Sequence, residues 1–347
     1  MNIKELYEKL LQAKRPIDFF GNVSSKNDLH VEFMKYVPMF DPEFAQHEDE
    51  YITGQTLSIL NELYELGLDE IKHGIYSKVN PVSFFKSTTP IFEITVEDQL
   101  YQIYWCICVG EVAYIFKGAS ENDVVYLKMA INPEDNDLID CEYDVLSTLR
   151  HQSLPYVEKE IKINSSNTIL MREVKGISMP DLMKEYQGGV PAEHVMWMLE
   201  RMLSVVGYLH SNFVVHGNIK PENIIINKNN HNVSLLGLSF CIKCANMPDT
   251  HYKIVNAFYT APEVNKTAKV LPSSDIYSIG KVAIELLGGN IETNEIPSFV
   301  DSRVREFIKK MVSLDPEDRP NDAWELWTEL RKIRTAVFGN QRFKTLN

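Results

Sequence analysis

The chain has 347 residues, of which 44% are hydrophobic and 24% are charged, as in an ordinary globular protein with one large or two modest domains. Its net charge of −13 argues against a broad surface for nucleic acid or for an anionic membrane, because both need clustered lysines and arginines. Five cysteines fit a reducing compartment, and no apolar run is long enough to span a bilayer. The opening sequence MNIKELYEKLLQAKR is an amphipathic helix pattern rather than a signal peptide. We therefore expect a cytoplasmic protein.

The secondary-structure pattern changes twice along the chain. Residues 1–87 read as helical, because segments such as IKELYEKLLQA repeat apolar residues at i, i+3 and i+4. From Thr88 onward, short runs rich in Val, Ile, Tyr and Thr predict strands, among them LYQIYWCICVG, VAYIFKGA, VVYLKMA and NTILMREV. After Pro180 the pattern is helical again. This order predicts an α+β fold with a small helical N-terminal region, a sheet-rich lobe and a larger helical lobe.

A series of short motifs follows the order and spacing that protein kinases show. After VVYLK come an acidic helix pattern, the turn RHQSLP, and then MREVKG, VVHGNIKPENIIIN, YTAPEV, DIYSIG and SLDPEDRP. Each motif alone is weak, but the set H-x-x-x-K-P-E-N, A-P-E, D-x-Y-S-x-G and D-P-x-x-R-P in one order is very improbable by chance. Residues 98–335 therefore resemble a protein kinase domain. The small lobe would span about 98–172 and the large lobe about 177–335.

The resemblance implies a vestigial nucleotide site. Lys128 matches the lysine that pairs with the phosphates, and Glu142 matches the glutamate that binds this lysine. Lys220 and Asn223 match the catalytic loop, in which the asparagine holds a magnesium ion. Met171 lies near the position that guards the nucleotide pocket.

The resemblance also implies a set of structural residues. Some match the apolar spine that ties the two lobes together, and others match the buried ionic groups of the large lobe. The spine positions are His216, Leu238 and Leu146, and the ionic positions are Glu263, Asp275 and Arg319.

Five departures from the family pattern affect its chemistry. Asn218 replaces the aspartate that accepts the substrate proton, and Gly237 replaces the aspartate that binds magnesium. The phosphate-covering loop keeps Gly110 but lacks its other two glycines. Tyr126 stands where a small residue lines the adenine pocket. Gly217 replaces the arginine that reads an activating phosphate. We therefore predict no catalytic residue at positions 218 and 237, and no cofactor.

No metal site is predicted either. Cys241 and Cys244 form a single C-x-x-C, whereas a structural zinc site usually needs two cysteine pairs or one pair with two histidines. Cys106 and Cys108 alternate on a predicted strand and read as thiols of the core or the surface.

Residues 1–87 are similar to a J-domain, the module that stimulates the seventy-kilodalton heat-shock chaperones. Where J-domains carry H-P-D, the sequence reads MFDPEF, so the stimulating histidine is missing. An unrelated helical extension is the alternative. With this N-terminal region and the H-G in VVHGN, the chain is identified as a member of a kinase-like family of bacteria and phages. A phage-encoded member would act in the host cytoplasm.

Three functions remain open. The first is a pseudokinase, a scaffold or regulator that binds protein partners through its large lobe and helical N-terminal region. The second is a divergent serine/threonine kinase or nucleotidyltransferase that holds ATP and magnesium differently. The third is a co-chaperone-like adaptor that contacts a heat-shock chaperone through residues 1–87. Neither nucleic acid nor a membrane is an expected partner.

Overall fold

The structure is a computed structural model that describes residue 90 and residues 92–121, 123–245, 250–265, 270–339 and 345–346. The helical N-terminal region expected at 1–87 and its J-domain-like character lie outside the described residues. The described chain divides into two compact units. The first contains residues 90–139 and 157–173, and the second contains residues 140–156 and those from 174 onward.

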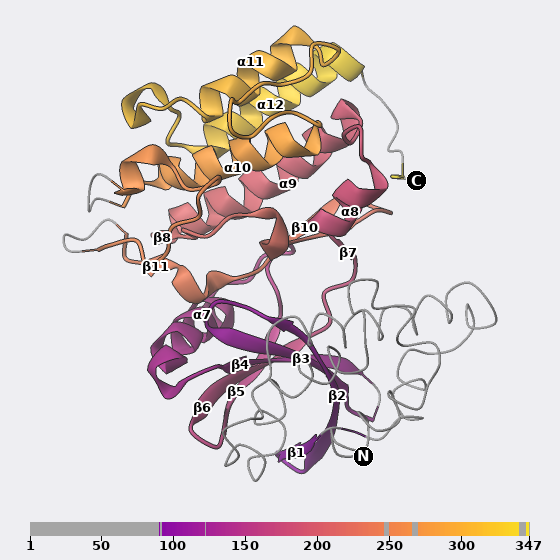
Figure 1. Cartoon of the computed structure of the whole chain (residues 1–347), viewed down its shortest axis with the longest axis vertical. Helices are drawn as coiled ribbons and strands as arrows, with labels where there is room; N and C mark the ends of the chain where they lie inside the picture. Colours follow the sequence, from indigo (N-terminus) through magenta and orange to yellow (C-terminus); the bar gives the residue numbers. More distant parts are fainter. Residues whose placement is uncertain are drawn as a thin grey trace, which may run out of the picture. The chain divides into compact units, whose positions relative to one another are not determined.

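An antiparallel six-stranded sheet forms the first unit (Figure 1). Its strands, in spatial order, are β1 (Phe92–Val96), β2 (Gln99–Val109), β3 (Ala113–Ala119), β4 (Val124–Ala130), β6 (Ser166–Arg172) and β5 (Val157–Ile163). Phe116, Leu127 and Leu170 lie in register on neighbouring strands, and all three are buried. Cross-strand neighbours share one face of a sheet, so these residues form the core of this unit.

The sheet begins at Phe92, within the β-rich pattern predicted from Thr88 onward and before residue 98, where the resemblance to kinases was placed. β1 pairs with β2 from Phe92 to Val96. The ring of Phe92 packs edge-on against Phe116, with 5.3 Å between ring centroids. This contact adds the aromatic area of Phe92 to the core.

Helices dominate the second unit, and α9 lies at their centre. α9 packs against α10 and α12, and α11 packs against the same two helices (Figure 1). The sequence of α9, AEHVMWMLERMLSVVGYLHS, is apolar on most of its faces, which is why it can be covered from several sides. The helices are α8 (Met179–Glu185), α9 (Ala192–Ser211), α10 (Pro272–Leu286), α11 (Ser302–Met311) and α12 (Ala323–Phe338).

Short strands and 3₁₀ turns bring the motif segments of the second unit together. The main short strands are β7 (Ile177–Ser178), β8 (Val214–Val215), β9 (Ile224–Asn227), β10 (Asn232–Leu235) and β11 (Ile242–Lys243). β9 pairs with β7 and β10, and β8 pairs with β11. These pairings join the loop after β8 to the segment after β10. Residues 140–148 of α7 (Asn136–Thr148) also belong to this unit.

The predicted α+β class is confirmed, since strands make up the first unit and helices dominate the second. None of the helices in the described ranges is long and apolar enough to cross a membrane.

A close approach between strands makes Gly118 the most sensitive glycine of the sheet. A Cβ at this position would lie 2.5 Å from the carbonyl oxygen of Gln102 and 2.6 Å from Cδ1 of Ile103. We expect Gly118→Ala to lower the free energy of unfolding by about 1–3 kcal/mol, measured by urea titration, because backbone must move to relieve the clash. In the matched control Gly110→Ala, the new Cβ meets only an oxygen at 3.4 Å. Equal losses in the two variants would contradict this packing.

Candidate functional site

The buried carboxylate of Asp275 holds the loop that follows β8. Asp275 lies in the first turn of α10 and is 1% exposed. Its Oδ2 accepts hydrogen bonds from the backbone N–H of His216 at 2.8 Å and from Nε2 of His210 at 2.9 Å. Its Oδ1 accepts one from the N–H of Gly217 at 2.9 Å. Burial by itself would raise the pKa of Asp275, but the bonds and charges of these neighbours lower it below its ordinary value.

The imidazole of His216 links this loop to the end of β10. Its Nδ1 accepts a hydrogen bond from the N–H of Asn218 at 3.2 Å, so the ring proton belongs on Nε2. Nε2 then donates to the carbonyl of Leu236 at 2.9 Å. A neutral ring satisfies both bonds. His216, Leu146 and Leu238, the three expected spine residues, are fully buried.

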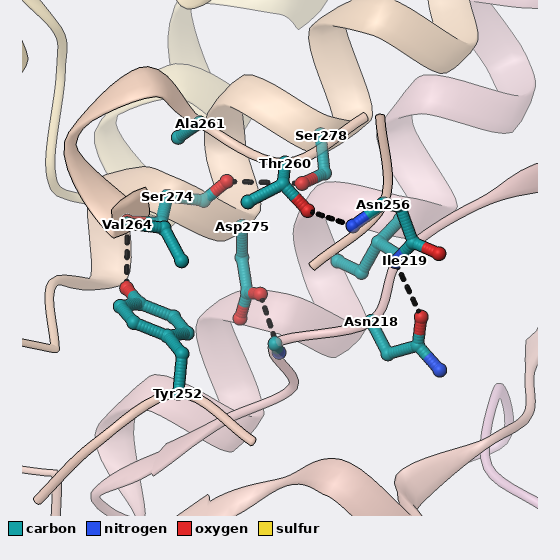
Figure 2. Close-up of a pocket in the computed structure, with 11 residues that line it drawn as sticks. Asn218, Ile219, Tyr252, Asn256, Thr260, Ala261, Val264, Ser274, Asp275 and Ser278 are labelled. Atoms are coloured by element: carbon teal, nitrogen blue, oxygen red, sulfur yellow. Dashed lines mark hydrogen bonds between the residues drawn. The ribbon is translucent and has the colours of Figure 1, made fainter. Parts of the chain in front are cut away.

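Asn218, at the position of the expected catalytic base, is held on both sides by other asparagines. Its side-chain oxygen accepts a hydrogen bond from Nδ2 of Asn256 at 2.8 Å (Figure 2). Its backbone carbonyl accepts one from Nδ2 of Asn223, also at 2.8 Å. Asn256 is fixed in turn, because its N–H donates to the hydroxyl of Thr260 at 2.6 Å. The cavity that these residues help to line measures about 10 Å³, roughly the space for one water molecule.

Gly237 and Asn223 stand at the two positions that hold metal in the kinases that the chain resembles. The backbone of Gly237 is left-handed, with a φ of 79°. A Cβ at this residue would lie 2.6 Å from Cγ of Asn223. The amide group of Asn223 thus takes the space into which a side chain at 237 would project. Lys220, which comes directly before η3 (Pro221–Asn223), is half-buried.

Ser239 has a role that the sequence did not indicate. Its hydroxyl donates a hydrogen bond of 2.7 Å to Oε2 of Glu142, and both residues are buried. Ser239 lies in η4 (Leu238–Phe240), directly after Gly237, and Glu142 lies on α7. The sequence shows a serine two residues after Gly237. Its partner could be found only from the fold, since 97 residues separate them.

Lys128 and Tyr126 stand on β4 in the first unit. They are two residues apart, so both point to the same face of the strand. Lys128 is buried. Nζ of Lys117 lies 5.5 Å from the ring centroid of Tyr126, whose partner in register on β6 is Met171. Lys128 and Glu142 belong to different units, so their pairing stays a prediction.

The expected phosphate-covering loop is a tight turn. β2 ends at Val109 and β3 begins at Ala113, which leaves three residues between them. The N–H of Gly110 donates to the carbonyl of Ala113 at 2.8 Å. One backbone donor of the turn is therefore already used within it.

The ion pair expected between Glu263 and Arg319 is formed. Two guanidinium nitrogens of Arg319 reach the two carboxylate oxygens of Glu263 at 2.7 and 3.1 Å, and both residues are buried. The hydroxyl of Ser274 also donates to this carboxylate, at 2.9 Å. Burial acts to raise the pKa of Glu263, but the bonds from Arg319 and Ser274 lower it below its ordinary value. A bidentate pair of this kind fixes the segment after YTAPEV to the helical core.

None of the described residues form a group of three or more His, Cys, Asp or Glu side chains placed to hold a metal ion.

The lowered pKa values of Asp275 and Glu263 predict acid sensitivity. Because their folded pKa values lie below the ordinary value of about 4, their stabilising contribution is complete above that pH and is lost as the pH falls below it. We expect Asp275→Asn to cost about 3–5 kcal/mol at pH 7, because three buried donors lose their charged acceptor. The variant should also flatten the pH dependence of stability below pH 5. Urea titrations from pH 7 to pH 3 measure both effects.

The control for this experiment is Asp315→Asn. Asp315 is an exposed carboxylate that accepts one hydrogen bond, from the N–H of Glu317. Its loss should change the free energy of unfolding by less than about 0.5 kcal/mol. If Asp275→Asn were as mild as this control, the buried carboxylate would not be the anchor of the loop.

Comparison with known proteins gives a consistent result. The family model for the protein kinase domain matches residues 101–331. The chain is similar to a probable serine/threonine-protein kinase of Dictyostelium discoideum, with 26% identity over 270 residues that cover 70% of this chain and 52% of that protein. It is also similar to a serine/threonine-protein kinase of Caenorhabditis briggsae, with 22% identity over 285 residues, or 71% of this chain and 24% of that protein.

A third relative comes from a bacterium, Corynebacterium efficiens. It carries the name serine/threonine-protein kinase and is 25% identical over 276 residues, which cover 70% of this chain and 51% of that protein. The chain thus spans about half the length, or less, of these curated relatives. The family model covers more than half of the chain, and the motifs it contains make the contacts described above. The chain belongs to the protein kinase domain family.

Proposed function

We propose that this chain is a pseudokinase, a kinase domain that binds protein partners without transferring phosphate. The observation that carries the proposal is the hydrogen bond from Asn256 to the side-chain oxygen of Asn218. In active kinases an aspartate at this position accepts the proton of the substrate hydroxyl. An amide oxygen has no useful proton affinity at neutral pH, and this one already accepts a bond from the chain itself. A substrate hydroxyl would find no base there.

The residues at the metal positions do not fit magnesium, which supports the same proposal. Magnesium prefers oxygen ligands in near-octahedral geometry, and kinases supply a carboxylate at the position of Gly237. Gly237 has no side chain, and Asn223 fills the adjoining space and donates its Nδ2 to Asn218. Of these two positions, only the neutral amide oxygen of Asn223 remains as a possible ligand. No step through a bound metal is derived for this site.

The first unit supports weak or absent nucleotide binding. The three-residue turn at Gly110 gives few backbone amides that could approach a phosphate. Tyr126 places a phenol ring on the face of β4 that also carries Lys128, at a position where kinases have a small residue. We infer that the ring takes volume that adenine would need.

A scaffold needs rigid support and an accessible surface rather than a reaction centre. The anchors at Asp275 and at the pair of Glu263 with Arg319 supply the support. Val255 and Phe258 lie on either side of Asn256, just before YTAPEV. Both expose large apolar side chains that a protein partner could cover. A second surface at residues 1–87, for a chaperone or another partner, is part of the proposal and rests on sequence resemblance alone.

A divergent serine/threonine kinase is the second candidate, and two observations favour it. The relatives carry the names of serine/threonine-protein kinases. Lys128 and Asn223, two residues that hold ATP and its metal in the family, are present. Such an enzyme would have to recruit a base and a metal carboxylate from other positions.

The pseudokinase proposal predicts that the chain does not transfer phosphate. We expect no transferred phosphate or AMP on the chain itself or on generic protein substrates, by radiolabelling and mass spectrometry. General-base catalysis alone contributes about 10²–10⁴-fold, and metal ions neutralise charge on the transferring group. The double variant Asn218→Asp, Gly237→Asp should also transfer no phosphate. Its new side chain at 237 would clash with Asn223, and the short turn at Gly110 would be unchanged.

Lys128→Ala provides the control for that assay. Transfer by the wild-type chain that disappears in Lys128→Ala would overturn the pseudokinase proposal in favour of the divergent enzyme. Transfer of equal size in both proteins would come from a contaminating kinase.

The proposal also predicts that the wild-type chain does not bind ATP measurably. A ligand that binds only the folded state raises its stability. We expect millimolar ATP with magnesium or manganese to leave the melting temperature of the wild type unchanged. Tyr126→Ala should be the variant in which a shift first appears, because it removes the ring from β4, and Tyr114→Ala on β3 is the matched control. A shift of several degrees in the wild type would show that Tyr126 does not block the pocket.

A further inference from the structure

Two cysteines from distant parts of the sequence lie side by side in the second unit. Cys141 is on α7, and Cys241 directly follows η4. Their Sγ atoms are 3.5 Å apart, and the Sγ of Cys141 is also 3.6 Å from the carbonyl oxygen of Cys241. Cys241 is fully buried, whereas Cys141 keeps 7% of its surface exposed. Cys141 is therefore the less deeply buried of the two residues.

The pair is joined to the Ser239 contact. Glu142 is the residue after Cys141, and Ser239 comes two residues before Cys241. The hydrogen bond between Ser239 and Glu142 therefore aligns the same two segments that carry the thiols. We call these four residues the α7 junction. It connects α7 to the activation segment, residues 237–263.

Charged groups surround the thiols unevenly. Nζ of Lys253 lies 3.6 Å from the Sγ of Cys141, and Lys243 is held nearby by an ion pair of 2.6 Å with Asp144. The negative charge of the Glu142 carboxylate disfavours a thiolate on Cys241. The hydrogen bond from Cys241 and the two lysines lower the pKa of Cys141 to about 6, although burial opposes the shift. The same bond, burial and Glu142 raise the pKa of Cys241.

This asymmetry assigns different chemical roles to the two sulfurs. The lowered pKa favours the thiolate on Cys141, and the thiolate is the form that attacks oxidants. Cys241 keeps its proton and lies within reach of any product formed on Cys141. A cysteine of lowered pKa next to a second thiol is the arrangement of a redox sensor with its resolving cysteine.

We propose that Cys141 and Cys241 form a peroxide-oxidisable pair whose disulfide ties α7 covalently to the activation segment. In the first step the Cys141 thiolate attacks one oxygen of hydrogen peroxide, the O–O bond breaks, and the departing hydroxide takes a proton to leave as water. In the second step the sulfur of Cys241 attacks the sulfenic acid on Cys141, the S–O bond breaks, and a second water leaves with the proton of Cys241. Two thiols lose two electrons, and the peroxide gains them.

The geometry requires only a local adjustment. A disulfide has about 2.05 Å between its sulfurs, so the two must approach each other by about 1.5 Å. The bond would close a loop of about 100 residues in the unfolded chain, which is the situation in which a cross-link stabilises most. Thiol reductants would reverse it. The inference does not depend on whether the domain transfers phosphate.

The test uses the full chain, reduced and then exposed to hydrogen peroxide over a range of pH. After free thiols are blocked, mass spectrometry of the digest without reductant should find a Cys141–Cys241 disulfide. Its rate of formation should fall several-fold as the pH drops from 7 to 5, and thiol reductant should remove it. The oxidised chain should melt on the order of 5 °C higher than the reduced chain.

Single variants separate the two roles. Cys241→Ser should accumulate sulfenic acid on Cys141, which dimedone traps, and Cys141→Ser should leave Cys241 unreacted. Lys253→Met keeps both thiols and should slow the oxidation at pH 7, with an alkylation profile for Cys141 that moves to higher pH. Cys244→Ser removes an exposed neighbouring cysteine and should change nothing.

Two results would overturn the proposal. One is recovery of both thiols unmodified after peroxide treatment in the folded wild type. The other is a disulfide that joins either of them to Cys244 or Cys108 instead. Circular dichroism of each variant establishes that it is folded, and the Lys253→Met result stands even if a cysteine variant fails to fold.

Discussion

The carboxylate of Asp275 is the constraint on which the rest of the second unit depends. It sits on α10, one of the buried helices, and it binds two consecutive backbone N–H groups of the loop after β8. With those two groups fixed, the side chain of His216 points to Leu236, and Asn218 is brought against Asn256 and Asn223. A buried charge is costly unless it is fully paired, so the donors and the acceptor require each other.

The same support would serve an active enzyme equally well, so the pseudokinase proposed above would keep its fold without the chemistry. The loop needs its backbone bonds and the imidazole of His216, and neither involves the side chain at 218 or 237. In active kinases, the side chains at these two positions act on substrate and metal. Replacing aspartate by asparagine or glycine there leaves the anchor intact. In this chain Asn256 donates to the side chain of Asn218 and Asn223 donates to its backbone carbonyl, so these polar groups are satisfied.

The α7 junction carries a different kind of coupling. In the family, the glutamate of this helix pairs with the lysine of the small lobe, and here Glu142 also accepts a hydrogen bond from Ser239. The hydrogen bond and the thiol contact of Cys141 with Cys241 both join α7 to the activation segment. The position of this helix is therefore tied to the start of that segment from within the second unit, whatever Lys128 does.

The sequence by itself determined the fold class and the identity of the motif positions, because both depend on local patterns. Runs rich in Val, Ile, Tyr and Thr marked β3, β4 and β6. The resemblance to kinases singled out Glu263 and Arg319 as ionic residues, and in the structure these two side chains form an ion pair. The substitutions at Asn218 and Gly237 could also be read directly. The β-rich pattern after Thr88 predicted the strand at Phe92–Val96 as well, but the aromatic contact of Phe92 with Phe116 could not be read from the sequence, because Phe116 lies on another strand.

Only the tertiary structure decided which partners Asn218, Ser239 and Cys141 contact. The partners of Asn218, Ser239 and Cys141 lie 38, 97 and 100 residues away along the chain. No periodicity links positions so far apart, since hydrogen bonds and thiol contacts depend on distance in space and on the direction of single side chains. Sequence patterns report which residues are buried and which elements they form. They do not report which buried donor meets which acceptor, because that is fixed only when the helices and strands have packed together.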